Sequence, residues 1–402
     1  MSISRREFIK GAGAMAALGL VGMPRLSFAS LPTDNRFILV ILRGALDGLA
    51  AVPPYGDRDY KAQRRSLAFA EPGELDGALD LNGFFGLNPA MQPLMALYQQ
   101  KQLAVLHAVA SPYRERSHFD AQNLLENGTL AANGTSGWLN RALQALKADA
   151  GAGIAINQQI PLVLQGAVDV GSWAAKSRDV DAASDYMTKI ASLYQADPLL
   201  STAFREGMQA QQLAQQGLSQ DDQTADKNAK DPGALYAAAQ AAALFLTKEN
   251  GPRVAVMEAG GWDTHSRQGT ADGALFKRLG DLARGLAALP EALGPVWKKT
   301  VVVVVTEFGR TVAVNGTEGT DHGTGSAAFV MGGGVHGGKV LGQWPGLASG
   351  NLYQNRDLMP TTDMRSIFKT VLYAHLNAPK AELEGSIFPG SSTAGMIPGL
   401  LL

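Results

Sequence analysis

The 402-residue sequence contains no cysteine, few aromatic residues (7%) and no block of basic residues. The missing cysteines exclude disulfide bonds, thiolate metal sites and a cysteine nucleophile. A formal net charge of −1 without a basic block makes nucleic acid a poor candidate partner. Beyond the first thirty residues no run is apolar enough to predict a membrane-spanning helix. Stability must therefore come from burial of a large core.

The first 29 residues have the pattern of a twin-arginine export signal. Arg5 and Arg6 precede a bulky apolar pair and Lys10, and residues 11–23 form a Gly/Ala-rich apolar stretch too short to span a bilayer. Small residues around Phe28 predict cleavage after Ala29, although a short N-terminal helix or an uncleaved membrane anchor would also fit. The pattern predicts transport by the twin-arginine translocase to the periplasm as a folded protein, in which a metal ion could already be bound.

The rest of the chain alternates strand and helix patterns, which predicts an α/β fold with a mostly parallel central sheet flanked by helices. Unbroken apolar runs rich in β-branched residues are typical of strands buried on both faces. We expect strands at 37–42, 103–109, 161–164, 253–258, 300–305 and 327–331, and helices at 88–100, 117–128, 271–294 and 361–377, the last capped by Thr361 or Thr362. Residues 30–402 are read as one domain with a helical insertion at about 180–250, which would serve either as a lid or as a plain helical layer.

Acidic and histidine residues follow four of the expected strands. In an open α/β sheet, ligands bind at the carboxyl ends of the strands. Carboxylates and imidazoles together suit a divalent ion, here zinc, manganese, calcium or magnesium. The candidate metal ligands are Asp47, Asp263, His265, Glu307, Asp321 and His322, with His118 as a possible additional ligand.

Each candidate also has an ordinary structural explanation. Asp47 could cap a helix, Glu307 could pair with Arg310, and Asp321 with His322 could form a hydrogen-bonded turn. The metal hypothesis rests on their joint occurrence at strand ends. His107, His336 and His375 have no such setting, and we interpret them as structural.

Ser117 is the candidate nucleophile because it begins a predicted helix, whose free N–H groups and dipole stabilise an ionised oxygen. It could equally be a simple N-cap. Arg310, Arg43 and Arg116 are candidates to clamp an oxyanion, and Arg310 is the one we place in the catalytic set.

The sequence resembles a bacterial family of exported proteins, domain of unknown function 1501. The resemblance spans most of the mature chain and is carried by R-G-A-L-D-G-L at 43–49, R-S-H-F-D-A-Q at 116–122, G-W-L-N-R at 137–141, G-G-W-D-T-H at 260–265, T-E-F-G-R-T at 306–311 and G-T-D-H-G at 319–323. That family is similar to the alkaline-phosphatase and sulfatase superfamily, which implies a two-metal α/β hydrolase core.

The resemblance also implies roles for individual residues. It matches Asp47 with the metal-binding aspartate after the first strand, Ser117 with the nucleophile, and Asp263, His265 and His322 with metal ligands. Glu307 and Phe308 stand where the superfamily has a further Asp-His pair, and phenylalanine cannot bind a metal. The spacing of Asp263 and His265 is two, whereas the superfamily usually has four.

Two functions fit these observations. The first is a periplasmic metal-dependent hydrolase of a phosphate or sulfate ester, small or polymeric, in which Ser117 attacks and Arg310 stabilises the developing charge. The second is a non-catalytic binding or assembly protein for an anionic envelope ligand on the same scaffold.

Overall fold

The computed structural model describes residues 31–174 and 233–402. The export signal at 1–29 and most of the expected insertion at 180–250 lie outside these residues; of the insertion, helix α9 (Ala234–Leu246) is described. The larger strands are β1 (Arg36–Arg43), β4 (Leu103–Ala110), β5 (Gly153–Ile156), β7 (Val254–Gly260), β8 (Thr300–Thr306) and β9 (Ser326–Met331). Shorter strands are β2 (Leu79–Asp80), β3 (Gly86–Leu87), β6 (Gly171–Ser172), β10 (Lys339–Leu341) and β11 (Thr362–Asp363).

The helices connect these strands. They are α2 (Gly48–Ala51), α3 (Tyr60–Arg64), α4 (Met95–Gln99), α5 (His118–Asn127), α6 (Trp138–Ala145), α9, α10 (Gly273–Leu293), α11 (Met364–Ala374) and α12 (Lys380–Glu382). Shorter 3-10 turns cover Arg65–Leu67, Pro89–Leu94, Leu162–Leu164, Gly294–Lys299 and Ser349–Asn351, and a π turn covers Leu383–Ile387.

A central sheet organises the described part of the chain. Its strand order is β10-β4-β9-β8-β1-β7-β5-β6, and β11 pairs with β4. Strand β1 is parallel to both β7 and β8, so the three strongest apolar runs lie side by side and end at one edge. Strand β9 runs antiparallel to β4 and β8, while the other pairings in this sheet are parallel. The mixed, mostly parallel sheet confirms the predicted fold class.

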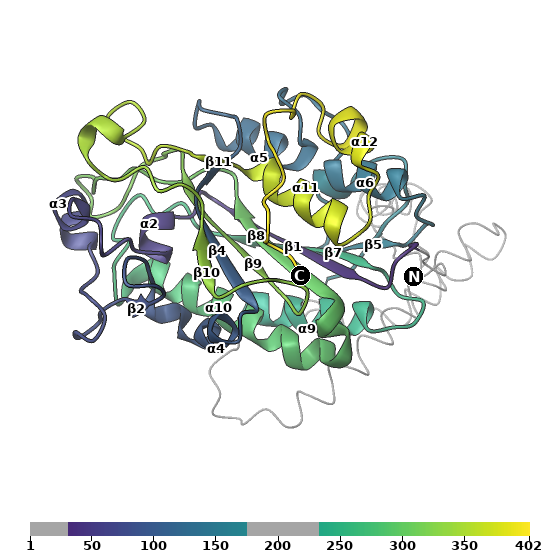
Figure 1. Ribbon diagram of the computed structural model, residues 1–402, viewed down its shortest axis with the longest axis horizontal. Helices are drawn as coiled ribbons and strands as arrows, with labels where there is room; N and C mark the ends of the chain where they lie inside the picture. The colour runs from purple at the N-terminus through teal and green to yellow at the C-terminus, as the bar shows by residue number, and fades with distance from the viewer. Residues whose placement is uncertain (1–30, 175–232) are drawn as a thin grey trace, which may run out of the picture.

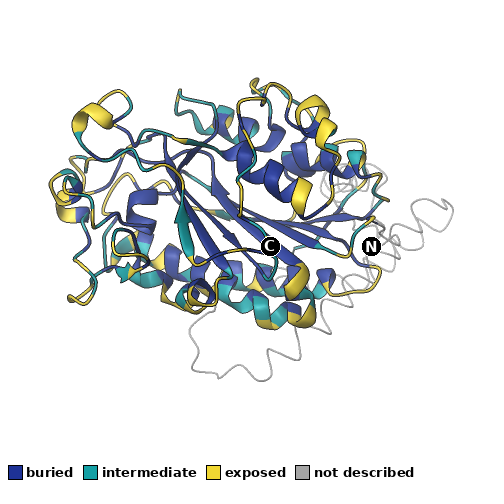
Figure 2. Ribbon diagram, in the orientation of Figure 1, coloured by how far each residue is buried: buried dark blue, intermediate teal, exposed yellow. Residues whose placement is uncertain are grey.

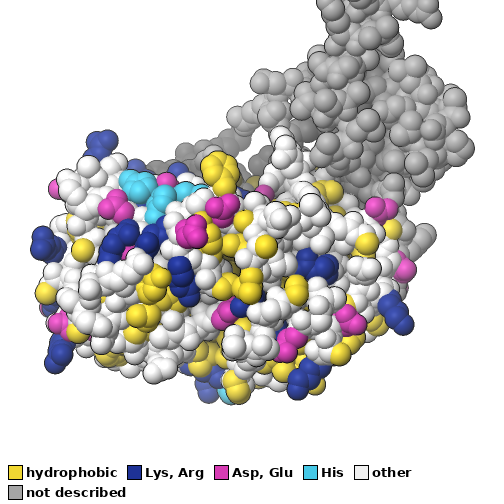
Figure 3. Space-filling model, turned by 90° about the horizontal axis from the view of Figure 1, so that it is seen from above, with side chains coloured by type: hydrophobic (Ala, Val, Ile, Leu, Met, Phe, Trp, Pro, Cys, Tyr) yellow, Lys and Arg dark blue, Asp and Glu magenta, His cyan; other side chains and the backbone are white. Residues whose placement is uncertain are grey.

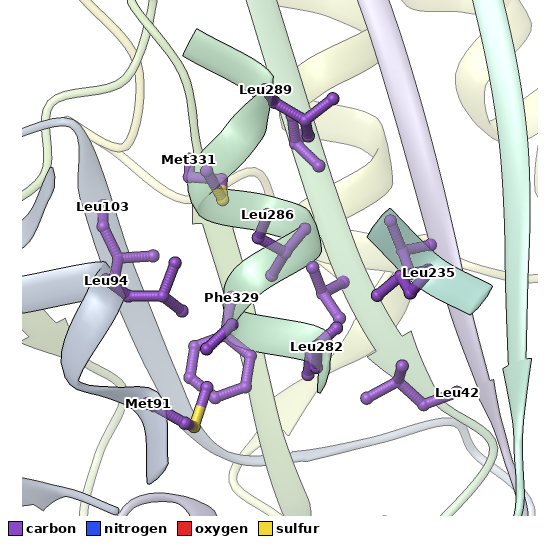
Figure 4. Close-up of a cluster of buried hydrophobic side chains, with 14 of the residues drawn as sticks. Leu42, Met91, Leu94, Leu103, Leu235, Leu282, Leu286, Leu289, Phe329 and Met331 are labelled. Atoms are coloured by element: carbon purple, nitrogen blue, oxygen red, sulfur yellow. The ribbon is translucent and has the colours of Figure 1, made fainter. Parts of the chain in front are cut away.

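Helices cover both faces of the sheet (Figure 1), with α9 and α10 on one face and α5, α6 and α11 on the other. Successive residues of a strand point to opposite faces. In β1, Ile38, Val40 and Leu42 accordingly enter one core, and Phe37, Leu39 and Ile41 enter the other. Figure 2 shows the central strands buried along most of their length, whereas β10 is only half-buried. Figure 4 shows the packing of α9 and α10 residues with Met331 and Phe329 of β9 in the first core.

Two local predictions are wrong. Leu162–Leu164 is a 3-10 turn rather than a strand, because its backbone is held by side chains: Glu126 Oε2 accepts from Val163 N at 3.0 Å and Asn140 Nδ2 donates to Leu164 O at 2.8 Å. The strand of this region is β5, which precedes the turn in sequence. The cap of α11 is Asp363, whose Oδ1 accepts from Arg365 N at 2.9 Å, rather than either threonine.

Candidate metal centre

Four side chains meet at the carboxyl edge of the sheet. His118 is the first residue of α5, and Asp263 and His265 follow β7. His322 comes from a loop beyond β8 that is fixed by an antiparallel bridge between Arg310 and His322 and by a Gly309 N–H donated to Thr324 O at 2.8 Å. Elements far apart in the sequence therefore deliver their polar side chains to one place.

The ring nitrogens and one carboxylate face one another closely. His118, Asp263 and His322 each offer an atom within 4.8 Å of the others. The Nε2 of His322 lies 3.0 Å from the Nε2 atoms of both His118 and His265. The Oδ1 of Asp263 lies 3.0 Å from His265 Nε2 and 3.2 Å from His322 Nε2, and its Oδ2 lies 3.6 Å from His118 Nε2.

The opposite nitrogen of each ring has an oxygen acceptor. His118 Nδ1 lies 2.9 Å from Glu307 Oε1, His265 Nδ1 lies 3.3 Å from Asp321 Oδ1, and His322 Nδ1 lies 3.1 Å from the carbonyl oxygen of Arg116. A carboxylate or carbonyl oxygen accepts only, so a neutral ring that uses this contact carries its hydrogen on Nδ1. In the neutral rings, the Nε2 lone pairs of His118 and His265 then both face Nε2 of His322.

This donor set fits a divalent cation. Three lone pairs and a carboxylate in mutual contact repel one another, and a proton shared by two rings relieves only one of these contacts. Four ligands around a tetrahedral zinc ion lie about 3.3 Å apart, given metal–ligand lengths near 2.0–2.1 Å. The ligand atoms of His118, Asp263 and His322 lie 3.0–3.6 Å apart, which brackets that value, and His265 contacts this group through His322 and Asp263. Imidazole bound on the far side by a carboxylate or carbonyl is also the usual arrangement of metal-ligating histidines.

Two predicted ligands lie behind the rings instead of beside them. Glu307 is fully buried and accepts hydrogen bonds from Gly44 N at 2.8 Å and from Gln122 Nε2 at 3.1 Å as well as from His118. Burial opposes ionisation, but the hydrogen bonds from His118 and Gln122 dominate and lower the pKa of Glu307. The same contact raises the pKa of His118. Asp321 holds His265 in the same way, and hydrogen bonds from Asn315 and His265 lower its pKa.

A glycine is required where Glu307 meets the β1 loop. Gly44 has a φ of +118° and donates its N–H to Glu307, and a Cβ at this position would lie 2.8 Å from the backbone nitrogen of Asp263. The loop after β1 thus touches both the carboxylate that orients His118 and the backbone that carries Asp263.

Asp47 lies outside the cluster. It is buried, caps α2 by accepting from Leu49 N and Ala50 N, and forms an ion pair with the equally buried Arg64. Gln268 Nε2 donates at 2.7 Å to Asp47 Oδ2, the oxygen that also pairs with Arg64. The structure therefore gives Asp47 the capping role that its sequence position also allowed.

Arg310 supports Asp263. Its Nη1 pairs with Asp263 Oδ1, its Nη2 donates to the Thr320 carbonyl, and its Nε donates to Thr320 Oγ1 at 3.1 Å. Burial opposes ionisation of Asp263, yet the hydrogen bond and charge of Arg310 lower its pKa. The alternative of an Arg310–Glu307 ion pair is therefore wrong, and all three guanidinium nitrogens of Arg310 bind other groups. Arg43 is likewise bound, to Glu258, Glu126 and Gln122.

Ser117 immediately precedes His118 and is half-buried. It occupies the N-cap position of α5, but its side chain makes no capping hydrogen bond. Its backbone N–H donates to the Tyr113 hydroxyl at 3.3 Å. The N-terminus of α5 is therefore not capped by the hydroxyl of Ser117.

Phe308 packs beneath the centre. Its ring centroid lies 4.9 Å from that of His118 and 5.3 Å from that of His322, and it joins Ala45 and Ala121 in a small apolar cluster. On this side the histidine rings therefore contact apolar side chains, which offer no ligand for a second ion.

The remaining histidines are placed elsewhere. His107 is buried, donates from Nε2 to Val52 O at 2.9 Å and accepts from Ala108 N at Nδ1; burial lowers its pKa to about 4. His375 lies 2.9 Å from Arg36 O through Nε2, and burial lowers its pKa.

The sequence reasoning missed the polar network behind Asp263. Gln268 Oε1 accepts from Thr264 Oγ1 at 2.7 Å and from Thr320 Oγ1 at 2.8 Å, which joins the Asp47–Arg64 pair to Arg310. It also missed Arg356, whose guanidinium donates to the carbonyl of His322. A glutamine four residues after Thr264 and an Arg-Asp pair at 356–357 were the available signals, and neither is distinctive alone.

Comparison with solved structures gives partial likenesses. The phosphonate monoester hydrolase of Agrobacterium radiobacter is 10% identical, with a TM-score of 0.37 over 86% of this chain and 74% of that one. The zinc complex of the C-terminal periplasmic domain of EcEptC from Escherichia coli is 10% identical, with a TM-score of 0.32 over 77% and 76%. A cold-active alkaline phosphatase from Shewanella sp. is 13% identical, with a TM-score of 0.29 over 69% and 70%. A search of curated proteins finds no match.

Comparison with protein families gives two matches. A twin-arginine translocation signal matches residues 2–22, so the chain is exported to the periplasm by that translocase. In the described residues, no helix is long and apolar enough to cross a membrane. The family described as "Protein of unknown function (DUF1501)" matches residues 34–381, which include every residue of the cluster, and the chain belongs to this family.

Proposed function

We propose that the protein is a periplasmic metal-dependent hydrolase of phosphate or sulfate esters, with one divalent cation held by His118, His322 and Asp263 and flanked by His265. The observation that carries the proposal is the convergence of three Nε2 atoms on one carboxylate, each ring being bound through Nδ1 to an oxygen acceptor. Three imidazoles favour zinc or a similar transition metal over calcium and magnesium, which prefer oxygen ligands.

The chain's own residues provide the remaining parts. Asp263 and His265 are 38% and 46% exposed at their side chains, so a substrate can reach the centre from solvent. Arg310 orients Asp263, and Glu307 orients His118. When bound, a divalent ion would polarise an ester oxygen and favour ionisation of a nearby hydroxyl or water. Ser117 is the candidate nucleophile because it precedes His118 and leaves its hydroxyl out of the helix cap.

Metal analysis tests the first half of this proposal. Protein purified from the periplasm should contain about one zinc-like ion per chain, and Asp263→Asn should lose most of it, because the amide has no charge to offer the ion. Asp34→Asn, the same change at a 71% exposed carboxylate that pairs with Lys299 and precedes β1, is the matched control. Metal content that is equal in all three proteins would refute the site.

The second half is tested with chromogenic phosphate and sulfate esters. Ser117→Ala should abolish turnover and keep the bound metal, whereas His265→Ala should reduce both. Since the Ser117 side chain makes no capping hydrogen bond, its loss should change stability little. Wild-type turnover by Ser117→Ala would exclude covalent catalysis by this residue.

A binding function on the same scaffold is the second candidate. It is favoured by Phe308, which occupies the position where a second ion's ligand was expected, and by the complete engagement of Arg310 and Arg43 in ion pairs. A metal-loaded protein that binds phosphate-bearing polymers but turns over no ester in the panel would support this candidate over hydrolysis.

A further inference from the structure

An anionic substrate needs a positive partner at the centre, and the arginines expected for that role are engaged elsewhere. Arg310 binds Asp263 and Thr320. Arg43 binds Glu126, Glu258 and Gln122. The inference drawn here rests on the proposed function and identifies which residues receive the anionic group.

Two other arginines share a single carboxylate beside the cluster. Asp357 is fully buried, and its Oδ2 accepts from Arg116 Nε at 2.8 Å and from Arg116 Nη2 at 2.7 Å. Arg356 Nε lies 3.5 Å from the other oxygen, Oδ1. Two guanidinium groups against one carboxylate leave one positive charge without a counter-charge in this group.

Both arginines form a hydrogen bond with His322, Arg116 through its backbone and Arg356 through its side chain. The carbonyl oxygen of Arg116 lies 3.1 Å from His322 Nδ1, and the Nη2 of Arg356 donates to the carbonyl oxygen of His322. The uncompensated charge is therefore fixed next to a candidate metal ligand. In the space-filling view of Figure 3, Lys and Arg side chains lie beside the His side chains on this face.

The pair is held in place but remains open to solvent. Arg116 has a φ of +62°, an uncommon conformation for a residue with a side chain and one that is found at binding sites. Its Nη2 also donates to Gln354 Oε1 at 2.7 Å, and its guanidinium carbon lies 5.9 Å from the centre of the Tyr353 ring. The side chains of Arg116 and Arg356 are 17% and 41% exposed, and neither Nη1 has a hydrogen-bond partner within residues 31–174 and 233–402.

We propose that Arg116 and Arg356, around Asp357, form an anion-binding subsite beside the metal centre that receives the phosphate or sulfate group of the substrate. Guanidinium groups bind such oxyanions through directed, charge-assisted hydrogen bonds. The subsite exists without the metal, because its geometry depends on the protein's own hydrogen bonds.

Chelated, metal-free protein provides the test. Isothermal titration with inorganic phosphate and with inorganic sulfate should give saturable binding that weakens with added sodium chloride. Arg356→Gln should weaken binding by about tenfold or more, since a charged hydrogen-bond partner is lost. Arg356→Lys keeps the charge but not the planar guanidinium group, so its affinity for phosphate should lie between those of wild type and Arg356→Gln. Arg58→Gln, at an 88% exposed arginine that pairs with Asp59, is the control and should bind as wild type does.

Asp357→Asn separates this proposal from a purely structural role for the two arginines. Removing the shared carboxylate with an isosteric amide frees a second positive charge, so phosphate should bind more tightly than to wild type. A purely structural cluster would instead bind no more tightly after this change. Equal phosphate binding by wild type and Arg356→Gln, both folded by circular dichroism, would overturn the subsite.

Zinc titration of the same proteins distinguishes this proposal from the proposed function. Arg356→Gln should bind zinc as wild type does, because Arg356 donates to the carbonyl oxygen of His322, and not to its ring. Anion binding without zinc binding would leave the subsite standing and defeat the metal-dependent function. If zinc binds but wild type and Arg356→Gln bind the anions equally well, the metal site stands and the subsite is refuted.

Discussion

The buried ion pair between Asp47 and Arg64 gives the sharpest test of how this site is built. Their side chains are 1% and 0% exposed. Arg64 also donates from Nη1 to the carbonyl oxygens of Thr311 and Val312, at 3.3 and 3.1 Å. Substituting Arg64 by methionine keeps much of the volume but leaves the carboxylate of Asp47 buried without its cation.

Removing one partner of a buried ion pair typically destabilises a protein by about 3–5 kcal/mol. The two carbonyl bonds lost with Arg64 place our expectation at the upper end of that range. The double variant Asp47→Asn with Arg64→Met has no buried charge, so it should recover part of the loss. Urea unfolding of the chelated single and double variants would give both free energies and the coupling between them.

The double variant also discriminates between two roles for Asp47. If Asp47 caps α2 and pairs with Arg64, the double variant keeps the full zinc content, because its sites of change are not ligands. If Asp47 binds the ion, zinc is lost along with the carboxylate. Loss of zinc in the double variant, or a cost below about 1 kcal/mol for Arg64→Met, would refute the assignment of this pair.

Three further predictions concern other parts of the chain. Changing Arg5 and Arg6 to lysine should leave the precursor in the cytoplasm, as cell fractionation would show, and normal export would contradict the signal assignment. Burial lowers the pKa of His107 in the folded protein to about 4, below its ordinary 6.5. As the pH falls, the unfolded chain therefore takes up a proton first, and the free energy of unfolding declines by ~3 kcal/mol between pH 6.5 and 4. His107→Gln should remove that part of the decline in urea titrations, and an unchanged pH profile would count against it. Glu307→Ala should weaken zinc affinity by about 10–100-fold while His118 itself is retained, because the ring loses its orienting acceptor; unaltered affinity in a competition assay would be inconsistent with this role.

Much of the fold could be predicted because its signals are local. The runs at 37–42 and 300–305 are strands buried on both faces, and a parallel sheet of such strands has helices over both faces. The run at 161–164 has a similar composition but becomes a turn, because Glu126 and Asn140 bind its backbone groups. Such side-chain partners are distant in sequence, so apolar composition alone could not reveal them.

The location of the site could be predicted from the sequence, but the orientation of its side chains could not. Strand ends at one edge of a parallel sheet identified His118, Asp263, His265 and His322 as neighbours. The sequence did not distinguish a carboxylate that faces the centre from one that lies behind an imidazole, as Glu307 does. That difference depends on side-chain direction over a few ångströms, and a pattern of residue types carries no such information.

The convergence of lone pairs implies that the folded chain holds the centre open before any ion binds. Two unprotonated Nε2 atoms at 3.0 Å repel one another, and a shared proton relieves only one of the two contacts that His322 makes, so the surrounding structure must oppose the repulsion that is left. The opposing contacts are buried ones: Glu307 behind His118, Arg310 on Asp263, and the strand bridge that carries His322. These contacts depend on the sheet and not on the ion, and we therefore expect chelated protein to remain folded and to gain stability on adding zinc.

The size of that gain follows from mass action. An ion that binds only the folded state adds about 2.7 kcal/mol at a concentration 100 times its dissociation constant. For a domain of this size, each kcal/mol of added folding free energy raises the melting temperature by about 2–4 °C. A rise of several degrees should therefore be measurable by calorimetry. Asp263→Asn should abolish the rise but leave the chelated protein folded. If chelated wild-type protein is instead unfolded by circular dichroism, the centre is assembled by the ion, and the argument that the sheet holds it open is wrong.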